Sequence, residues 1–241
     1  MDSVDSAAPS PQHGLRVVGV LGGVGSGKST AARFLAQALA APHLDADAEV
    51  ARLFADPALL QQLDARFGGG LLQEDGSLDR AELGRRVFDD ASARQALESI
   101  LHPAVRRALW LGLQQAEAAA TGPEPGFAVL DVPLLLENGL SKACDFLVFV
   151  EVPDALRAAR AGARHGWDEA TWRAREAAQA PLTAKRAAAD AILDNAGGVE
   201  DLRAAVEGLI PRLRALPPRS LRPPVTPTYQ SQFSGMNALV I

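Results

Sequence analysis

The sequence predicts an α/β fold in which helices alternate with the strands of a parallel, doubly wound sheet. Short apolar runs recur along the chain, and segments with helical periodicity separate them. The candidate strands are residues 16–21, 42–45, 127–131, 146–152 and 191–194. Since ligands of such sheets bind beyond the carboxyl ends of the strands, we expect the functional residues at that edge.

The first strand runs into a glycine-rich loop, "GGVGSGKST" at residues 22–30, which fits the pattern GxxxxGK[ST]. Glycines allow backbone turns that point successive N–H groups at phosphate oxygens. Lys28 would bring positive charge to the β and γ phosphates, and the Ser29 hydroxyl can bind Mg²⁺. The alternative is a glycine-rich turn without a ligand. The preceding strand and the apolar helical face of "STAARFLAQALA" favour a phosphate-binding P-loop.

Acidic side chains follow two of the candidate strands. "HLDAD" places Asp45 and Asp47 after the second strand, and "VLDVPLLLE" places Asp131 at the end of the third, with Glu137 six residues later. An apolar strand ending in Asp is typical of the element that helps to hold Mg²⁺ in many P-loop proteins. The alternative for Asp131 is a cap of the following turn. Helix capping accounts for one carboxylate of the Asp45 and Asp47 pair, but not readily for both.

Two segments between strands are longer than a simple crossover requires. The first, 48 to about 126, is strongly helical, and the second, 153–189, is helical and rich in arginine. Arg157, Arg160 and Arg164 are spaced three and four residues apart, so we expect them to share one helical face. A solvated basic face is the alternative. We favour a lid, because a phosphoryl group in transfer needs positive charge around it.

Composition limits the classes of partner. The 241 residues suffice for one α/β domain with an inserted subdomain, and the net charge of −5 argues against a nucleic-acid partner. Cys144 is the one cysteine, which excludes an internal disulfide framework and a CxxC metal site. No apolar run reaches about 20 residues, and the N-terminus has no signal pattern. We therefore expect a cytoplasmic protein without a membrane partner.

The chain resembles the dephospho-CoA kinase family from about residue 16 to about residue 213. The resemblance is carried, in order, by "GGVGSGKST", "DADAEVARLF", "GSLDRAELGRRVF", "LESILHPAVRR" and "DVPLLLENGL". "RAARAGARHGW" is similar to the family's lid, and "REAAQAPLTAKRAAADAILDN" to the segment after it. The P-loop is the specific motif, and the order and spacing of the others strengthen the match.

The resemblance implies transfer of the γ-phosphoryl group of ATP to the 3′-hydroxyl of dephospho-CoA, with Mg²⁺ as the metal. The residues implied to bind ATP are Gly25, Ser26, Gly27, Lys28, Ser29, Thr30, Arg160 and Asn195. Lys28 and Arg164 carry catalytic charge, and Asn195 lies where the adenine is approached. Ser29 and Asp131 are the expected metal ligands. The family often has Gln at the position of Arg157, which leaves the contacts of the lid open.

On the acceptor side, the resemblance assigns Asp47 as the base for the acceptor hydroxyl. The residues implied to handle dephospho-CoA are Asp47, His102, Arg106, Pro133, Leu134 and Leu135. A P-loop kinase for another small-molecule or nucleotide acceptor is the alternative function. A GTPase-type switch would require an NKxD signal, and the sequence contains none. For the oligomeric state, a monomer is the expectation.

The domain organisation follows from these patterns. Residues 1–14 predict a disordered N-terminal extension, because Ser, Ala, Pro and Asp dominate them. Residues 15–213 predict a P-loop kinase domain, with the acceptor-binding insertion at 48–126 and the lid and following helix at 153–189. Residues 214–241 form a Pro-rich tail that should resist regular structure, although its last residues are apolar enough to dock somewhere.

Overall fold

The computed structural model contains one parallel sheet with the strand order β2-β3-β1-β4-β5. It describes residues 14–88, 90–122, 124–217, 219 and 221. The strands are β1 (Leu15–Gly22), β2 (His43–Asp45), β3 (Gly126–Asp131), β4 (Phe146–Glu151) and β5 (Ala191–Asp194). The predicted fold class and the five predicted strands are therefore confirmed, with bounds that shift by at most one residue. The predicted extension at residues 1–14 lies outside the described part, except for Gly14.

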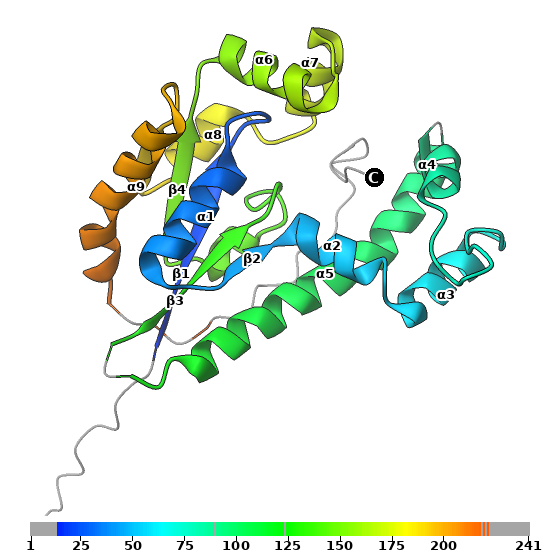
Figure 1. The fold of residues 1–241 in the computed structure, drawn as a ribbon, viewed down its shortest axis with the longest axis horizontal. Coiled ribbons are helices and arrows are strands. Elements are labelled where there is room, and N and C mark those ends of the chain that lie inside the picture. The colour runs from blue at the N-terminus through cyan, green and yellow to red at the C-terminus, as the bar shows by residue number, and fades with distance from the viewer. Residues whose placement is uncertain (1–13, 89, 123, 218, 220, 222–241) are drawn as a thin grey trace, which may run out of the picture.

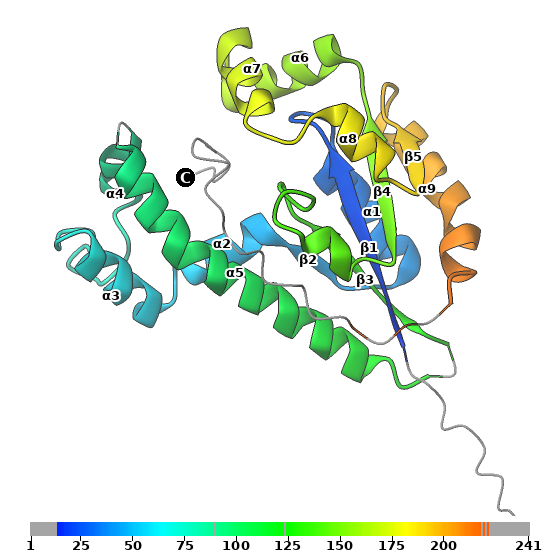
Figure 2. The ribbon, with the colours of Figure 1, turned by 180° about the vertical axis from the view of Figure 1, so that it is seen from behind.

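Both faces of the sheet are covered by helices (Figure 1). All eight residues of β1, the central strand, are buried, as its continuous apolar pattern predicts for a parallel sheet. One face packs against α1 (Lys28–Leu39) and α9 (Val199–Arg214), whose apolar residues form one core with β1 and β4. The opposite face packs against the C-terminal half of α5 (Ala91–Ala119) and the turn after β3. Figure 2 shows this second face.

The long segment after β2 is helical, as predicted. It contains α2 (Ala46–Leu53), α3 (Pro57–Arg66), α4 (Arg80–Phe88) and the N-terminal half of α5. These helices bury a separate apolar core around Leu63, Leu83 and Leu101. Because α5 also packs on the sheet, it joins this helical insertion to the α/β core (Figure 1).

The second long segment forms three shorter helices, α6 (Asp154–His165), α7 (Glu169–Ala177) and α8 (Leu182–Ala187). Helices α6 and α7 contact each other and lie beyond the carboxyl ends of the strands, next to the P-loop (Figure 1). This is the position that a lid requires. No helix in the described part of the chain is both long and apolar enough to cross a membrane.

Two residues of the Pro-rich tail, Arg219 and Leu221, contact the core. The Leu15 N–H donates to the Arg219 carbonyl at 3.2 Å, which forms an antiparallel bridge at the start of β1. The Leu221 N–H donates to a Glu117 carboxylate oxygen at 3.2 Å, and the Leu221 side chain packs against the core beneath α5. Because β4 begins opposite Val18, it leaves the Leu15 N–H unpaired on that side of β1, and an extended segment can bond there, which proline composition alone does not reveal.

Truncation after Ala215 should therefore lower the melting temperature more than truncation after Leu221. Each lost hydrogen bond is worth about 1 kcal/mol, and each kcal/mol shifts the melting temperature of a domain of this size by about 2–4 °C. Thermal unfolding of the two truncated proteins checks the difference. Equal melting temperatures would mean that the contacts of Arg219 and Leu221 contribute nothing to the fold.

Candidate functional site

The P-loop joins β1 to α1 through glycines in the left-handed region. Gly25 has φ 81° and Gly27, the N-cap of α1, has φ 85°, so a side chain at either position would strain the backbone. The loop thereby delivers the N-terminus of α1, with its unpaired N–H groups, to the carboxyl edge of the sheet. The loop thus has the backbone conformation that a phosphate cradle needs.

Lys28, the first residue of α1, folds back over this loop. Its Nζ donates to the Gly23 carbonyl at 2.8 Å and to the Gly22 carbonyl at 3.2 Å. Burial, and then the charge of Lys185, lower the pKa of Lys28 to about 8. A phosphate bound nearby would raise the pKa of such a lysine again, because a negative charge stabilises the protonated amine.

Asn195 is bonded to the backbone of the P-loop. It follows β5 and is buried, and its Nδ2 donates to the Ser26 carbonyl at 2.8 Å. A Cβ at Gly27 would lie 2.5 Å from this amide nitrogen, which gives a second reason for glycine there. The structure thus places Asn195 against the loop, and its predicted approach to the adenine stays a prediction.

Helices α6 and α7 contact the tip of the P-loop at Val24. The Val24 N–H donates to the Glu176 carboxylate at 2.8 Å, and the Val24 carbonyl accepts from Trp172 Nε1 and from Arg157, each at 3.2 Å. Arg157 is buried and pairs with Glu176 at 2.8 Å. The contacts of Arg157, which the sequence left open, are therefore with the loop backbone, with Glu176 of α7 and with Asp154 at the start of its own helix.

The other two arginines of α6 reach different parts of the site. Arg160 donates to the Gly197 carbonyl at 3.4 Å, beside the segment that carries Asn195. Arg164 is exposed and lies close enough to Asp47 to lower the pKa of that carboxylate, although other contributions outweigh it. The three arginines of α6 therefore have different surroundings. Arg157 is buried against the P-loop, and Arg160 lies beside the segment after β5. Arg164 is exposed near Asp47.

The two carboxylates of "HLDAD" have different roles in the structure. Asp45 is the N-cap of α2, and its Oδ1 accepts from the N–H groups of Asp47 at 2.9 Å and Ala48 at 3.2 Å. Asp47 lies in the first turn of α2 with a solvent-accessible side chain. The protein atoms packed around it, and then the charges of Asp45 and Asp131, raise the pKa of Asp47. A carboxylate with a raised pKa is a better proton acceptor than an ordinary one.

Asp131, the last residue of β3, is buried, and its Oδ2 has no hydrogen-bond partner among the described residues. The His43 side chain on β2 lies beside it, with 3.4 Å between His43 Nε2 and Asp131 Oδ2. A buried carboxylate without a hydrogen-bond partner is unfavourable unless a cation compensates it. Asp131 therefore fits a metal ligand, and His43 is a neighbour that the sequence analysis did not select.

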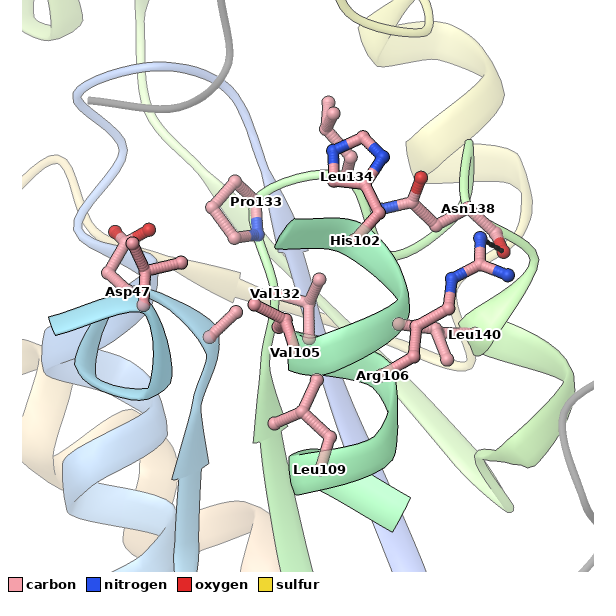
Figure 3. A pocket seen from close by; sticks show the side chains of 12 residues that line it. Asp47, His102, Val105, Arg106, Leu109, Val132, Pro133, Leu134, Asn138 and Leu140 are labelled. Atoms are coloured by element: carbon pink, nitrogen blue, oxygen red, sulfur yellow. Dashed lines mark hydrogen bonds between the residues drawn. The ribbon is translucent and has the colours of Figure 1, made fainter. Parts of the chain in front are cut away.

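A pocket opens between α2, α5 and the turn after β3 (Figure 3). It brings together five of the six residues predicted to handle the acceptor: Asp47, His102, Arg106, Pro133 and Leu134. The residues that the sequence analysis missed are Ala46, Val50, Val105, Leu109, Val132, Asn138 and Leu140. Val105 and Leu109 follow His102 by three and seven positions, so helical periodicity could have identified them. The wall is mostly apolar, with a carboxylate at one side and an arginine at the other.

Leu135 is the exception among the predicted acceptor residues, because it does not line this pocket. It is 1% exposed and belongs to the core beneath the turn. In a turn, consecutive side chains point in different directions, and sequence alone does not say which of three adjacent apolar residues faces inward.

Arg106, across the pocket from Asp47, is held by a backbone carbonyl. Arg106 donates to the Asn138 carbonyl at 3.1 Å, a bond that Figure 3 shows. Burial, and then the Arg106 charge, lower the pKa of His102, which favours its uncharged imidazole. Arg106, on the described wall of the pocket, is the cation available to an anionic acceptor.

A buried ion pair joins the turn after β3 to the segment after α7. Lys185 Nζ lies 3.2 Å from Glu137 Oε1 and donates to Gln179 at 2.7 Å, and both charged side chains are almost fully buried. The same Glu137 oxygen accepts from the Ala180 N–H at 2.8 Å. The turn after β3 and the segment that follows α7 are therefore held together, and Lys185 is close enough to Lys28 to lower its pKa.

Comparison with known proteins gives consistent matches over most of the chain. A model of the dephospho-CoA kinase family matches residues 16–201. A dephospho-CoA kinase of Anaeromyxobacter dehalogenans is 42% identical over 202 residues, which cover 83% of this chain and 93% of the relative. The crystal structure of a Thermus thermophilus protein superimposes with a TM-score of 0.66 at 34% identity, covering 83% of this chain and 98% of that one. The dephospho-CoA kinase of Campylobacter jejuni superimposes with a TM-score of 0.58 at 23% identity, covering 83% and 97%, and so shares the fold.

Proposed function

This chain belongs to the dephospho-CoA kinase family and phosphorylates dephospho-CoA to coenzyme A, and we propose how its residues divide that work. The reaction moves the γ-phosphoryl group of ATP to the 3′-hydroxyl of the acceptor. ATP binds at the P-loop, and dephospho-CoA occupies the pocket between α2, α5 and the turn after β3. The observation that carries this assignment is the position of Asp47, which lines the pocket and also interacts electrostatically with Lys28 and Arg164.

Asp47 orients the acceptor hydroxyl and takes its proton. Its raised pKa suits this role, and the capping bonds to Asp45 fix the start of the helix that carries it. Asp45 is occupied as the cap. Asp47 lies between the acceptor pocket and the cations of the phosphate site. A kinase needs its base in this position, because the acceptor hydroxyl attacks the γ-phosphate there.

The P-loop holds the phosphates of ATP. Gly25, Ser26, Gly27, Ser29 and Thr30 supply backbone N–H groups and hydroxyls, and Lys28 exchanges the Gly22 and Gly23 carbonyls for phosphate oxygens. Arg160 and Asn195 serve the nucleotide from the side of β5. The grip of the lid on Val24 couples closure of α6 and α7 to the shape of this loop.

Ser29 and Asp131 would hold Mg²⁺, and the unpartnered Oδ2 of Asp131 supports that choice. A bound Mg²⁺ neutralises charge on the β and γ phosphates. The protein is expected to act as a monomer in the cytoplasm, and both statements stay predictions that come from its sequence.

The pocket assignment predicts that Arg106→Met raises the KM for dephospho-CoA. Hydrogen bonds to charged groups are worth about 1.5–3 kcal/mol, so loss of one to the acceptor diphosphate should raise this KM by at least ~10-fold. The KM for ATP should change little. The next residue, Arg107, is exposed on the same helix, so Arg107→Met is the matched control. Equal KM values for the acceptor in both variants would place dephospho-CoA elsewhere.

The lid assignment predicts that Arg164→Ala lowers kcat more than it weakens ATP binding. A lid arginine meets the phosphates most closely when charge redistributes during transfer, so its contribution is largest in the transition state. Steady-state kinetics and a nucleotide-binding titration separate the two effects. Arg173, an exposed arginine on α7 that pairs with Glu169, supplies the control Arg173→Ala. Unchanged kinetics of Arg164→Ala would favour a solvated basic face.

A further inference from the structure

The strands β2 and β3 bring three side chains with metal-ligating atoms together at the carboxyl edge of the sheet. His43 and Asp45 are two positions apart in β2, so their side chains leave the same face of the strand. Asp131 ends β3 and is the register partner of Asp45. One potential ligand atom from each residue lies within 4.8 Å of the other two.

The contact between His43 and Asp131 is incomplete as a hydrogen bond. Both His43 Nε2 and Asp131 Oδ2 are buried without a hydrogen-bond partner among the described residues, and Asp131 is only 3% exposed. The 3.4 Å between the two atoms is longer than a good hydrogen bond. Two ligands bound at about 2.0–2.2 Å to one tetrahedral ion lie roughly 3.3–3.6 Å apart. The spacing therefore fits two ligands that face a shared cation.

Among the described residues, neighbouring side chains do not occupy the space between His43, Asp45 and Asp131. Lys28 is close enough for Asp131 to affect its pKa, but its ammonium donates to the Gly22 and Gly23 carbonyls. The capping bonds of Asp45 use Oδ1, which leaves Oδ2 for another partner. The His43 side chain is 20% exposed, so an ion can enter from its edge.

We propose that His43, Asp45 and Asp131 bind a transition-metal ion of the Zn²⁺ and Co²⁺ class. An imidazole nitrogen suits these ions, whereas Mg²⁺ prefers oxygen ligands alone. Two carboxylates and a neutral imidazole balance the charge of a divalent ion, and water completes its coordination. The three residues bind this ion in the absence of nucleotide, so this site is separate from the metal binding that the kinase reaction requires. Because it shares Asp131 with the proposed Mg²⁺ site and adds charge beside Asp47, occupancy inhibits transfer.

The test is a Co²⁺ titration of the metal-free, nucleotide-free full chain, followed by visible ligand-field absorption. One Co²⁺ should bind per chain, with a spectrum more intense than that of the aqueous ion, and Zn²⁺ should displace it while Mg²⁺ in excess does not. His43→Gln and Asp131→Asn should each weaken Co²⁺ binding by at least ~10-fold, because loss of an outer-shell partner alone usually costs roughly 10–100-fold in metal affinity. His165→Gln, at an exposed histidine of α6, should bind like the wild type.

Two results would overturn the site. One is a spectrum that stays that of aqueous Co²⁺, and the other is wild-type affinity in folded His43→Gln, which would leave the His43 and Asp131 contact as an ion pair. Circular dichroism establishes that each variant folds, and His43→Gln tests the site even where Asp131→Asn does not fold. The Zn²⁺ concentration that halves turnover should also rise by about tenfold in His43→Gln. Because the titration contains no nucleotide, its outcome is independent of the assigned kinase roles.

Discussion

Lys28→Ala should lower kcat/KM for ATP by at least ~10²-fold, the usual cost of removing one group that stabilises transition-state charge. The side chain already lies over the P-loop, and its ammonium is bound only by the Gly22 and Gly23 carbonyls among the described hydrogen bonds. Phosphate oxygens are the stronger partners, because charge-assisted bonds between two ions exceed those to a neutral carbonyl. Steady-state kinetics with saturating dephospho-CoA measure the loss.

The same substitution should leave the protein folded. The pKa of Lys28 is about 8, below its ordinary value, so the charged amine costs the native state free energy at neutral pH. That cost disappears as pH rises through 8 toward the ordinary pKa, and the alanine substitution removes it at every pH. We expect an unchanged or higher melting temperature at pH 7. Lys142→Ala, at an exposed lysine far along the chain, controls for loss of a positive charge. Near-normal turnover by Lys28→Ala would mean that this loop does not bind the phosphates of ATP.

Asp47→Asn should lower turnover with dephospho-CoA by at least ~10²-fold, the lower end of the usual general-base contribution. Asparagine keeps the size of the side chain and its place in the pocket, but it cannot take the proton of the acceptor hydroxyl. The KM for ATP should change little, because Asp47 lies on the acceptor side. Single-turnover kinetics with ATP and dephospho-CoA isolate the transfer step.

Asp45→Asn is the matched control for this substitution. Asparagine caps helices as well as aspartate, so its oxygen can still accept from the N–H groups of Asp47 and Ala48. We expect a smaller effect on transfer and a larger effect on the dependence of turnover on Mg²⁺. An inactive Asp45→Asn beside a nearly normal Asp47→Asn would reverse the assignment of the base.

Local patterns predicted the frame of the site. The P-loop follows from glycines whose backbone only glycine adopts easily, and the strands follow from β-branched runs that a parallel sheet buries. Asp45, Asp47 and Asp131 end up near one another because parallel strands present their carboxyl ends at one edge. These inferences need only short-range sequence and a known sheet type.

Contacts across long stretches of chain were not predictable in the same way. Arg157 and Val24 are 133 positions apart, and their bond depends on how α6 lies over the loop. The buried pair of Glu137 and Lys185 likewise requires the turn after β3 and α8 to pack side by side. His43 was overlooked because a single histidine in a short strand carries no signal until Asp131 is placed beside it. The burial of Leu135 in the core was not predictable either, because the family motif does not separate pocket from core.

The assigned acceptor is tested most directly by turnover of MgATP with a panel of acceptors: dephospho-CoA, nucleoside monophosphates and water. Rapid ADP formation should require dephospho-CoA, and the new phosphate should lie on its 3′-hydroxyl, as phosphorus NMR of the product would show. A nucleoside monophosphate as the preferred acceptor, or hydrolysis as fast as transfer, would contradict the assignment of the pocket between α2, α5 and the turn after β3.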